Sequence, residues 1–500
     1  MEKKIYFIGI GGISMSSLAV FSAVKGNLVS GSDISESENL KTLSNFGITY
    51  HIGHKKVNIE TFNPDEVVIN CAIKEDNDEL VWAKENNKKI VSRAKLLGNL
   101  SKEFKNIIAI SGTHGKTTTT ALIGEIFIEA NKKPSIHVGG VLKKCDSSFL
   151  IGEKRFFITE ACEYKNSFLE LSPSVGVVLN VEPDHLDFFK DIKEINSSFN
   201  QFLSNSKTKI FKINEFEYML KNEKISNIFS ARNLKKLEHG YSFDFYKNEE
   251  LIGTIKTNFL GEHNVKNSLV ACIVANYCKI PIKTIKKAIK NFSGVKRRFE
   301  EICKINKSIV VHDYAHHPTE ITKVIQQAKQ FGKVLTVFQP HTFSRTKKLF
   351  SEFTSCFNES DGLILIKTYP AREEEIESAT AKALFDTIIK ENTQFFPIFN
   401  NEEPQNFKEN LVVDNEHNLQ LDFFSKIEHK NEIDYVVENT RHFNQNNIGQ
   451  NNQNKKFCTY LENFSLAKEK ILGLTNFYDC ILILGAGDIV ELAYSLKSNK

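Results

Sequence analysis

The sequence has no strong excess of either charge and no closely paired cysteines. Lys and Arg total 65 against 61 Asp and Glu, which leaves a net charge of +4 over 500 residues. That balance argues against a surface built to bind nucleic acid, so we expect basic residues to act locally, on the phosphates of a small ligand. Nine cysteines fall at irregular intervals without a CxxC pair. This spacing argues against a zinc ribbon or a disulfide scaffold and favours reduced thiols in the cytoplasm.

Long hydrophobic runs are also missing. The uncharged stretch from Ile5 to Val24 follows two lysines and superficially resembles a signal peptide. However, Gly9, Gly11 and Gly12 interrupt it, and a buried strand, a glycine turn and a helix explain the same residues better. No other stretch reaches the ~20 apolar residues that a membrane span requires. We therefore expect a cytoplasmic protein that does not insert into membranes.

One pattern recurs three times along the chain: a short apolar strand, a polar or glycine-rich turn and a helical stretch. This pattern is typical of parallel α/β layers and predicts three domains, at 1–103, 104–297 and 298–500. The Asn- and Gln-rich stretch at about 400–456 has few apolar residues and is interpreted as an insertion in the third domain. The predicted strands are Lys4–Gly9, Asn27–Asp33, Glu66–Asn70, Asn106–Ser111, Phe156–Thr159, Val175–Val181, Ser308–His312, Lys333–Phe338, Gly362–Lys367 and Cys480–Gly485.

The segment Ser111–Thr120 (SGTHGKTTTT) follows an apolar strand and precedes a helical pattern, which indicates a P-loop. Glycines allow backbone N–H groups to surround phosphate oxygens, and a lysine adds a full positive charge. The threonine that follows the lysine can reach Mg²⁺. The residues predicted to hold a nucleotide here are Gly112, Thr113, His114, Gly115, Lys116, Thr117 and Thr118.

Two acidic clusters each follow a predicted strand of the same domain. They are Glu160–Glu163 (EACE) and Glu182–Asp187 (EPDHLD). Carboxylates suit Mg²⁺, and strand ends that face a P-loop are where such sheets hold ligands. Beside a P-loop, these clusters predict a metal site rather than solvated loops.

The N-terminal segment resembles a dinucleotide-binding fingerprint. Gly9, Gly11 and Gly12 follow the first strand, Ser14 stands where a third glycine is usual, and Asp33 ends the second strand. The pattern fits any nucleotide diphosphate held at a helix N-terminus. On its own it is weak evidence for a nicotinamide cofactor.

Polar motifs also follow strands in the third domain. His312–Glu320 (HDYAHHPTE), Gln339–Arg345 (QPHTFSR) and Tyr369–Glu373 (YPARE) all lie at predicted strand ends. Arg345 and Arg372 could bind phosphate or carboxylate, or make surface salt bridges. The pair His316 and His317 suggests zinc only weakly, because no spaced third ligand accompanies it.

Read together in order, these motifs resemble those of the Mur ligases. They are GIGGISM, SGTHGKTTTT, EACEY, NVEPDHLD, GEHNVKNSL, GVKRRFE, DYAHHPTEI, FQPHTFSR, YPARE and LGAGDI. The resemblance implies an α/β fold with a Rossmann-like N-terminal domain that binds a UDP substrate, a central P-loop ATPase domain and a Rossmann-like C-terminal domain that binds an amino acid. It also implies ATP and Mg²⁺ as cofactors, UDP-N-acetylmuramate and L-alanine as substrates, and a monomer or homodimer.

The resemblance further implies roles for individual residues. Gly9, Gly11, Gly12, Ser14 and Asp33 would hold the UDP part. Thr117, Glu163 and His185 would bind metal, and Asn267, Arg298 and Asp313 would contact the adenosine and phosphates of ATP. The residues expected to act in catalysis are Lys116, His185, His316, His341, Arg345 and Arg372.

The implied reaction is phosphorylation of a carboxylate by ATP, attack of an amine on the acyl phosphate, and collapse to an amide, ADP and phosphate. The chain departs from the family pattern at Ser14, at Asn70–Cys71, where a serine pair is usual, and in the insertion. It also has no lysine in residues 194–206, where several relatives carry a carbamylated lysine. The alternatives are a sister ligase that attaches a preformed peptide, a nicotinamide oxidoreductase and a P-loop switch protein.

Overall fold

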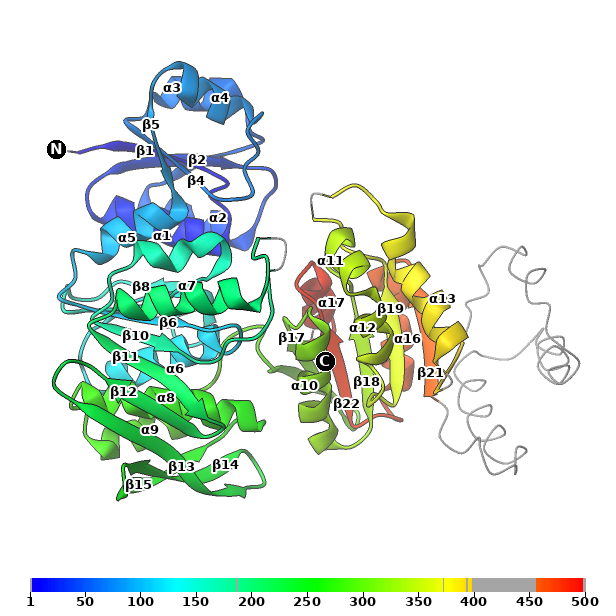
Figure 1. Ribbon diagram of the computed structural model, residues 1–500. Helices are drawn as coiled ribbons and strands as arrows, with labels where there is room; N and C mark the ends of the chain where they lie inside the picture. The colour runs from blue at the N-terminus through cyan, green and yellow to red at the C-terminus, as the bar shows by residue number, and fades with distance from the viewer. Residues whose placement is uncertain (1, 186–187, 372, 393, 398–455, 498–500) are drawn as a thin grey trace, which may run out of the picture. The chain divides into compact units, whose positions relative to one another are not determined.

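The computed structural model describes residues 2–185, 188–371, 373–392, 394–397 and 456–497. They form two compact units, Met1–Lys296 and Arg297–Lys500 (Figure 1). The first unit contains two sheets and the second contains one. The predicted α/β class with three sheet-based parts is therefore confirmed.

The first sheet has five parallel strands in the order β3-β2-β1-β4-β5. Helices α1 and α5 pack on one face, where Phe7 and Leu18 are fully buried, and α3 and α4 cover the other, where Tyr6 and Leu80 are buried. The elements are β1 (Lys4–Ile8), α1 (Ile13–Val24), β2 (Leu28–Asp33), α2 (Glu38–Leu43), η1 (Ser44–Phe46), β3 (Thr49–Ile52), α3 (Lys56–Phe62), β4 (Glu66–Ile69), α4 (Asp78–Glu85), β5 (Lys89–Ser92) and α5 (Arg93–Ser101).

The second sheet has ten strands in the order β15-β14-β13-β12-β11-β10-β6-β9-β7-β8. Strands β11, β10, β6, β9 and β7 run parallel, whereas β12–β15 form an antiparallel arm and β8 pairs antiparallel at the other edge. The elements are β6 (Asn106–Ser111), α6 (Lys116–Glu129), β7 (Ser135–Leu142), β8 (Ser147–Leu150), β9 (Phe156–Glu160), η2 (Tyr164–Glu170), β10 (Val175–Val178), α7 (Ile192–Ser204), β11 (Thr208–Asn214), β12 (Glu217–Lys221), β13 (Ser226–Lys236), β14 (Tyr241–Lys247), β15 (Glu250–Thr257), α8 (Glu262–Tyr277) and α9 (Ile282–Asn291).

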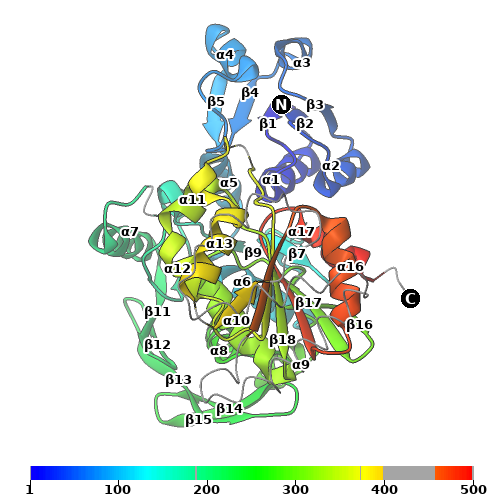
Figure 2. The same cartoon turned by 90° about the vertical axis from the view of Figure 1, so that its right-hand side faces the viewer.

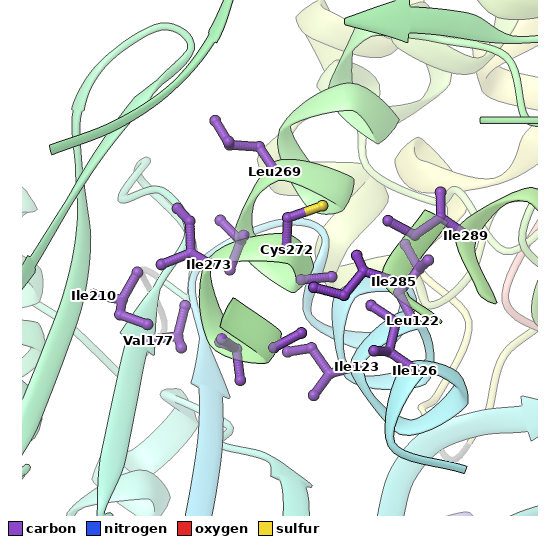
Figure 3. Close-up of a cluster of buried hydrophobic side chains, with 14 of the residues drawn as sticks. Leu122, Ile123, Ile126, Val177, Ile210, Leu269, Cys272, Ile273, Ile285 and Ile289 are labelled. Carbon is purple, nitrogen blue, oxygen red and sulfur yellow. The ribbon is translucent and has the colours of Figure 1, made fainter. Parts of the chain in front are cut away.

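The core of the second sheet lies between its strands and three helices. Leu122 and Ile126 of α6 pack with Ile273 of α8 and Ile289 of α9, and all four are fully buried (Figure 3). Val177 lies on the strand side of the same cluster. Removal of such side chains from water is the main force that fixes α6, and with it the loop before α6, on the sheet.

The opposite face of the second sheet shares one apolar cluster with the first sheet. Phe21 of α1 meets Phe157 of β9 edge to face, with ring centroids 5.9 Å apart. Phe104 stacks on the same Phe157 ring at 4.8 Å. Phe168 and Phe202 extend the cluster under α7. The first two sheets therefore form a single packed body.

The second unit is built on a seven-stranded sheet in the order β16-β17-β22-β18-β19-β21-β20, in which β17, β22, β18, β19, β21 and β20 run parallel. Helices α10, α12 and α13 cover one face, and α16 and α17 cover the other (Figure 2). The elements are β16 (Glu300–Ile305), β17 (Ser308–Asp313), α10 (Pro318–Ala328), η3 (Lys329–Phe331), β18 (Val334–Phe338), α11 (Phe343–Lys348), α12 (Phe350–Ser355), β19 (Gly362–Ile366), η4 (Glu377–Ala379), α13 (Ala381–Glu391), β20 (Phe395–Pro397), β21 (Lys456–Leu461), α16 (Phe464–Leu474), β22 (Cys480–Leu484) and α17 (Ile489–Ser495).

All ten predicted strands are present, with ends shifted by at most a few residues. The uncharged stretch near the N-terminus is a strand, a glycine turn and α1, as expected. Among the described helices, none has the length and apolar character needed to cross a membrane. The predicted insertion at about 400–456 lies almost entirely outside the described residues.

Candidate active site

The P-loop connects β6 to α6, and two of its glycines are required by positive φ angles and close packing. Gly112 has φ 137° and Gly115 has φ 85°, values that other residues rarely adopt. A Cβ at Gly112 would lie 2.9 Å from the Cβ of Leu179, and one at Gly115 would lie 2.5 Å from Oδ1 of Asn267. Any larger residue would push the loop away from β10 and α8. The P-loop geometry thus follows from its glycines.

A residue that sequence reasoning did not single out holds the loop from the side. Oδ1 of Asn180 accepts a hydrogen bond from the His114 backbone N–H at 2.9 Å, and its Nδ2 donates to the His114 carbonyl at 3.1 Å. The hydroxyl of Thr113 accepts from the Glu182 backbone N–H at 2.9 Å. The residues that follow β10 therefore hold the P-loop in place, because Asn180 binds both the N–H and the carbonyl of His114.

Lys116, the first residue of α6, bridges the P-loop and the first acidic turn. Its Nζ donates to the carbonyls of Gly112 (2.6 Å) and Thr113 (3.1 Å) and to Oε1 of Glu163 (2.9 Å). Burial disfavours the charged amine, but nearby groups, chiefly Glu163 with Cys162 and Glu160, together outweigh burial, so the pKa of Lys116 lies above its ordinary value. The lysine is therefore a fixed cation at the mouth of the loop.

The two acidic clusters meet beside this lysine. Glu163, Asp184 and His185 each offer a ligand atom, and these atoms lie within 4.8 Å of one another. Oε2 of Glu163 is buried and has no hydrogen-bond partner among the described residues. His185 has φ 52° and its ring packs on Tyr164 with centroids 4.8 Å apart. An orphaned carboxylate oxygen in a group of two acids and an imidazole fits a divalent cation such as Mg²⁺.

The predicted metal ligands Glu163 and His185 therefore come together, and Asp184 joins them as a further candidate. Thr117 lies one residue beyond Lys116 on α6 and is buried, whereas Thr118 is half-buried. Within the described part of the chain this is the one group of three or more such ligands, and His316 and His317 do not belong to it. The zinc alternative gains no support.

Asn267 of α8 lies behind the P-loop. Its Oδ1 accepts a hydrogen bond from the hydroxyl of Thr119 at 3.2 Å, and its Nδ2 donates to Asn264 at 3.1 Å. The side chain is thus part of the contact between α6 and α8, next to Gly115. Its expected contact with ATP remains a prediction.

The predicted UDP residues gather at the carboxyl ends of β1 and β2. Gly9, Gly11 and Gly12 form the turn into α1, and the Gly11 N–H donates to Oδ2 of Asp33 at 2.8 Å. Ser14, in the first turn of α1, lies 3.0 Å from Nε2 of His137 on β7 and accepts a hydrogen bond from Arg93 at 3.1 Å. The first sheet thus places a glycine turn, a helix N-terminus and a carboxylate together, which suits a nucleotide diphosphate.

The second unit has its own polar cluster at the carboxyl ends of its parallel strands. Asp313 ends β17 and is buried, and its oxygens accept from the backbone N–H groups of Phe299 (2.6 Å) and Ala315 (2.7 Å). Burial raises the pKa of Asp313 to about 6, although the charge of Arg298 opposes the rise. Arg298 lies over the Tyr314 ring at 5.4 Å. Asp313 and Arg298 are therefore neighbours, and their expected contacts with ATP remain predictions.

The histidines and the arginine of this cluster also come together. The rings of His316 and His341 lie 6.2 Å apart, and Nη1 of Arg345 donates to the carbonyl of His341 at 3.1 Å and contacts its Nδ1 at 3.1 Å. Burial lowers the pKa of His341 to about 4, with Arg345 adding to the effect, and burial also lowers the pKa of His316. Both imidazoles are thus neutral at pH 7 and can accept protons.

Two further arginines of the sequence motifs are Arg297 and Arg372. Arg297 was not predicted, yet its Nη2 donates to the carbonyls of Ala486 (3.1 Å) and Gly487 (3.2 Å) in the final glycine motif. No pattern in the sequence pairs residues 190 positions apart. Arg372, which the sequence analysis placed among the catalytic residues, lies outside the described residues.

Three family models match in chain order: the Mur ligase catalytic domain at residues 4–105, the Mur ligase middle domain at 110–275 and the Mur ligase glutamate ligase domain at 297–402. A UDP-N-acetylmuramate–L-alanine ligase from Clostridium beijerinckii is 39% identical over 436 residues, covering 82% of this chain and 93% of the relative. One from Caldicellulosiruptor bescii is 42% identical over 400 residues, covering 76% and 87%.

Solved structures extend the likeness to the whole fold. A UDP-N-acetylmuramate–alanine ligase from Thermotoga maritima has a TM-score of 0.73 at 23% identity and covers 99% of this chain and 98% of its own. A murein peptide ligase from Psychrobacter arcticus has a TM-score of 0.58 at 19% identity, with coverage of 99% and 98%. At such identities the likeness concerns the fold alone. With the three ordered domain matches and the two curated relatives, it leads to one conclusion: the chain belongs to the Mur ligase family.

Proposed function

We propose that the protein is an ATP-dependent ligase that joins L-alanine to the carboxylate of UDP-N-acetylmuramate in the synthesis of peptidoglycan precursors. The observation that carries the proposal is the identity of 39–42% to L-alanine ligases over 87–93% of their length. The arrangement of Lys116 against Glu163 supports the ATP-dependent step. Residues 1–103, 104–297 and 298–500 would then bind the UDP substrate, ATP and the amino acid, respectively.

A free carboxylate is a poor acyl donor, so the first step is its phosphorylation by ATP. The P-loop amides and Lys116 bind the phosphates, because positive charge concentrates there. Mg²⁺ neutralises phosphate charge, and Glu163, Asp184, His185 and Thr117 are the residues that would hold it. Hydrogen bonds to the Gly112 carbonyl and to Glu163 orient the lysine at the P-loop.

The second step is attack of the L-alanine amine on the acyl phosphate. Arg345 offers a guanidinium for the amino-acid carboxylate, and the neutral His316 and His341 can accept hydrogen bonds from the amine that attacks as the free base. Collapse of the tetrahedral intermediate then breaks the bond to phosphate and leaves the amide, ADP and inorganic phosphate. We further propose that the protein acts in the cytoplasm as a monomer or homodimer.

The proposal is tested by phosphate release with ATP, Mg²⁺, UDP-N-acetylmuramate and one amine at a time. L-Alanine should support release, and mass spectrometry should detect the alanyl amide of the nucleotide. Glycine, L-serine and a cell-wall tripeptide serve as competing amines. Faster turnover of the tripeptide would favour the sister ligase, and NAD binding without ATP hydrolysis would favour an oxidoreductase.

A further inference from the structure

Arg93 is a cation without an anionic partner at the edge of the predicted UDP site. It is the first residue of α5 and is half-buried, and its Nη1 donates a hydrogen bond to Oγ of Ser14 at 3.1 Å. Among the described residues its guanidinium makes no other hydrogen bond, and no carboxylate lies within ion-pair distance. A guanidinium carries five N–H donors, so several remain available for a ligand.

The hydrogen bonds around Ser14 fix the direction of its hydroxyl proton. The Thr159 hydroxyl donates to the Glu160 carbonyl at 3.0 Å, so its oxygen can only accept from Nδ1 of His137, which lies 3.0 Å away. Burial, together with the charge of Arg93, lowers the pKa of His137 to about 3, which keeps the ring neutral. A neutral ring with a proton on Nδ1 has a bare Nε2, and the Ser14 hydroxyl donates to it at 3.0 Å.

Ser14 is therefore fully used by the protein as a donor. Its one proton goes to His137, and its oxygen accepts from Arg93. The hydroxyl cannot also donate to a bound anion, although its position in the glycine motif suggested a direct contact with substrate. The donor that faces the ligand is instead the guanidinium that Ser14 holds in place.

Arg93 lies beside the turn that would hold the diphosphate. Ser14, which accepts the hydrogen bond from Nη1 of Arg93, is in the first turn of α1, where a diphosphate would bind. Ser14 also contacts His137 on β7, so the guanidinium lies where the glycine turn of the first sheet meets a strand of the second sheet.

We propose that Arg93 binds an anionic oxygen of the muramoyl nucleotide, either in its diphosphate or in the lactyl carboxylate that becomes phosphorylated, and that Ser14 and His137 position the guanidinium. The inference rests on the proposed function, since it takes the nucleotide as the ligand. Arginine suits either anion, because its planar fork can donate two parallel hydrogen bonds to phosphate or carboxylate oxygens.

Equilibrium binding of three nucleotides to the full chain, without ATP or amino acid, tests the inference. UDP-N-acetylmuramate, UDP-N-acetylglucosamine, which lacks the lactyl carboxylate, and UDP are titrated by calorimetry. Arg93→Gln should weaken UDP-N-acetylmuramate binding at least ~10-fold. The matched control is Lys95→Gln, two residues along the same helix, where Lys95 pairs with Glu170 on an exposed surface. It should change binding less than ~2-fold.

The three ligands identify the anion. Equal weakening for all three assigns Arg93 to the diphosphate, and weakening for UDP-N-acetylmuramate alone assigns it to the carboxylate. Undiminished binding of UDP-N-acetylmuramate by Arg93→Gln overturns the inference while leaving the proposed function intact. Failure of the wild-type protein to bind any of the three overturns both. ATP binding by each variant provides the folding control.

A double-mutant cycle tests the positioning role of Ser14. Ser14→Ala should weaken UDP-N-acetylmuramate binding in the wild-type background but have little further effect once Arg93 is Gln, because the hydroxyl acts through the guanidinium. Additive losses would show that Ser14 contacts the nucleotide independently and would contradict the positioning role.

Discussion

Lys116 and Glu163 form an ion pair of 2.9 Å between residues that are 47 positions apart in the sequence. The pair connects the start of α6 with the turn after β9, so it connects the P-loop with the candidate metal ligands. Both side chains are largely buried, which restrains the geometry of the pair.

Replacing this lysine should therefore abolish most of the activity. We expect Lys116→Ala to lower kcat at least ~10²-fold, because it removes a preorganised positive charge at the transferred phosphate. Phosphate release should be normalised to the folded fraction measured by near-UV circular dichroism, since the variant leaves Glu163 buried without its partner. Lys224→Ala, at an exposed lysine of the same unit, is the control. Normal turnover by folded Lys116→Ala would refute the role.

Replacement of Asn180 should change the affinity for ATP rather than the affinity for the amino acid. Asn180→Asp keeps the acceptor for the His114 N–H but replaces the donor to the His114 carbonyl with a second acceptor. Loss of one hydrogen bond and repulsion between two oxygens should raise the KM for ATP about 10-fold. Steady-state kinetics with each substrate varied in turn would check this. An equal rise in the KM for L-alanine, or no change relative to the exposed-site control Asn205→Ala, would contradict it.

The metal site should depend on Asp184 as well as on Glu163 and His185. We expect Asp184→Asn to raise the Mg²⁺ concentration for half-maximal activity about 10-fold, because an amide lacks the charge that a hard cation favours. Mn²⁺ binding followed by electron paramagnetic resonance in the presence of an ATP analogue would measure the site directly. Asp76→Asn, at an exposed position of the first sheet, should behave like the wild type. Unaltered Mn²⁺ affinity in Asp184→Asn would exclude Asp184 as a ligand.

Asp313 should make stability depend on pH. Its folded pKa of about 6 lies above the ordinary value of 3.8, so the folded state binds the proton more tightly than the unfolded state. The resulting stabilisation is complete below about pH 4 and is lost as the pH rises through about 6, a change on the order of 3 kcal/mol. Thermal unfolding of the wild type and Asp313→Asn from pH 4 to pH 7 measures it. The wild type should lose stability relative to the variant over this range, and a pH-independent difference would argue against the raised pKa.

The sequence was most informative about features that depend on residues close together in the chain. Apolar runs followed by glycine or polar turns identified all ten predicted strands, because buried parallel strands are apolar on both faces. The antiparallel arm was not predicted, since strands such as β13 (SNIFSARNLKK) have polar residues on an exposed face and no continuous apolar run. The strand ends also indicated that the acidic cluster with Glu163 lies beside the P-loop, although they did not predict its ion pair with Lys116. The contacts of Asn180 and Arg297 were not, because only the folded chain brings such distant residues together.

The shared apolar cluster under α1 sets a limit on how the chain can be divided. Phe21 of α1, which packs on the first sheet, and Phe157 of the second sheet belong to one interior, so a fragment cut near residue 103 would expose apolar faces on both pieces. Such pieces would tend to aggregate or to recombine with each other. Any attempt to study nucleotide binding in a smaller protein should therefore cut after Lys296, where the first compact unit ends.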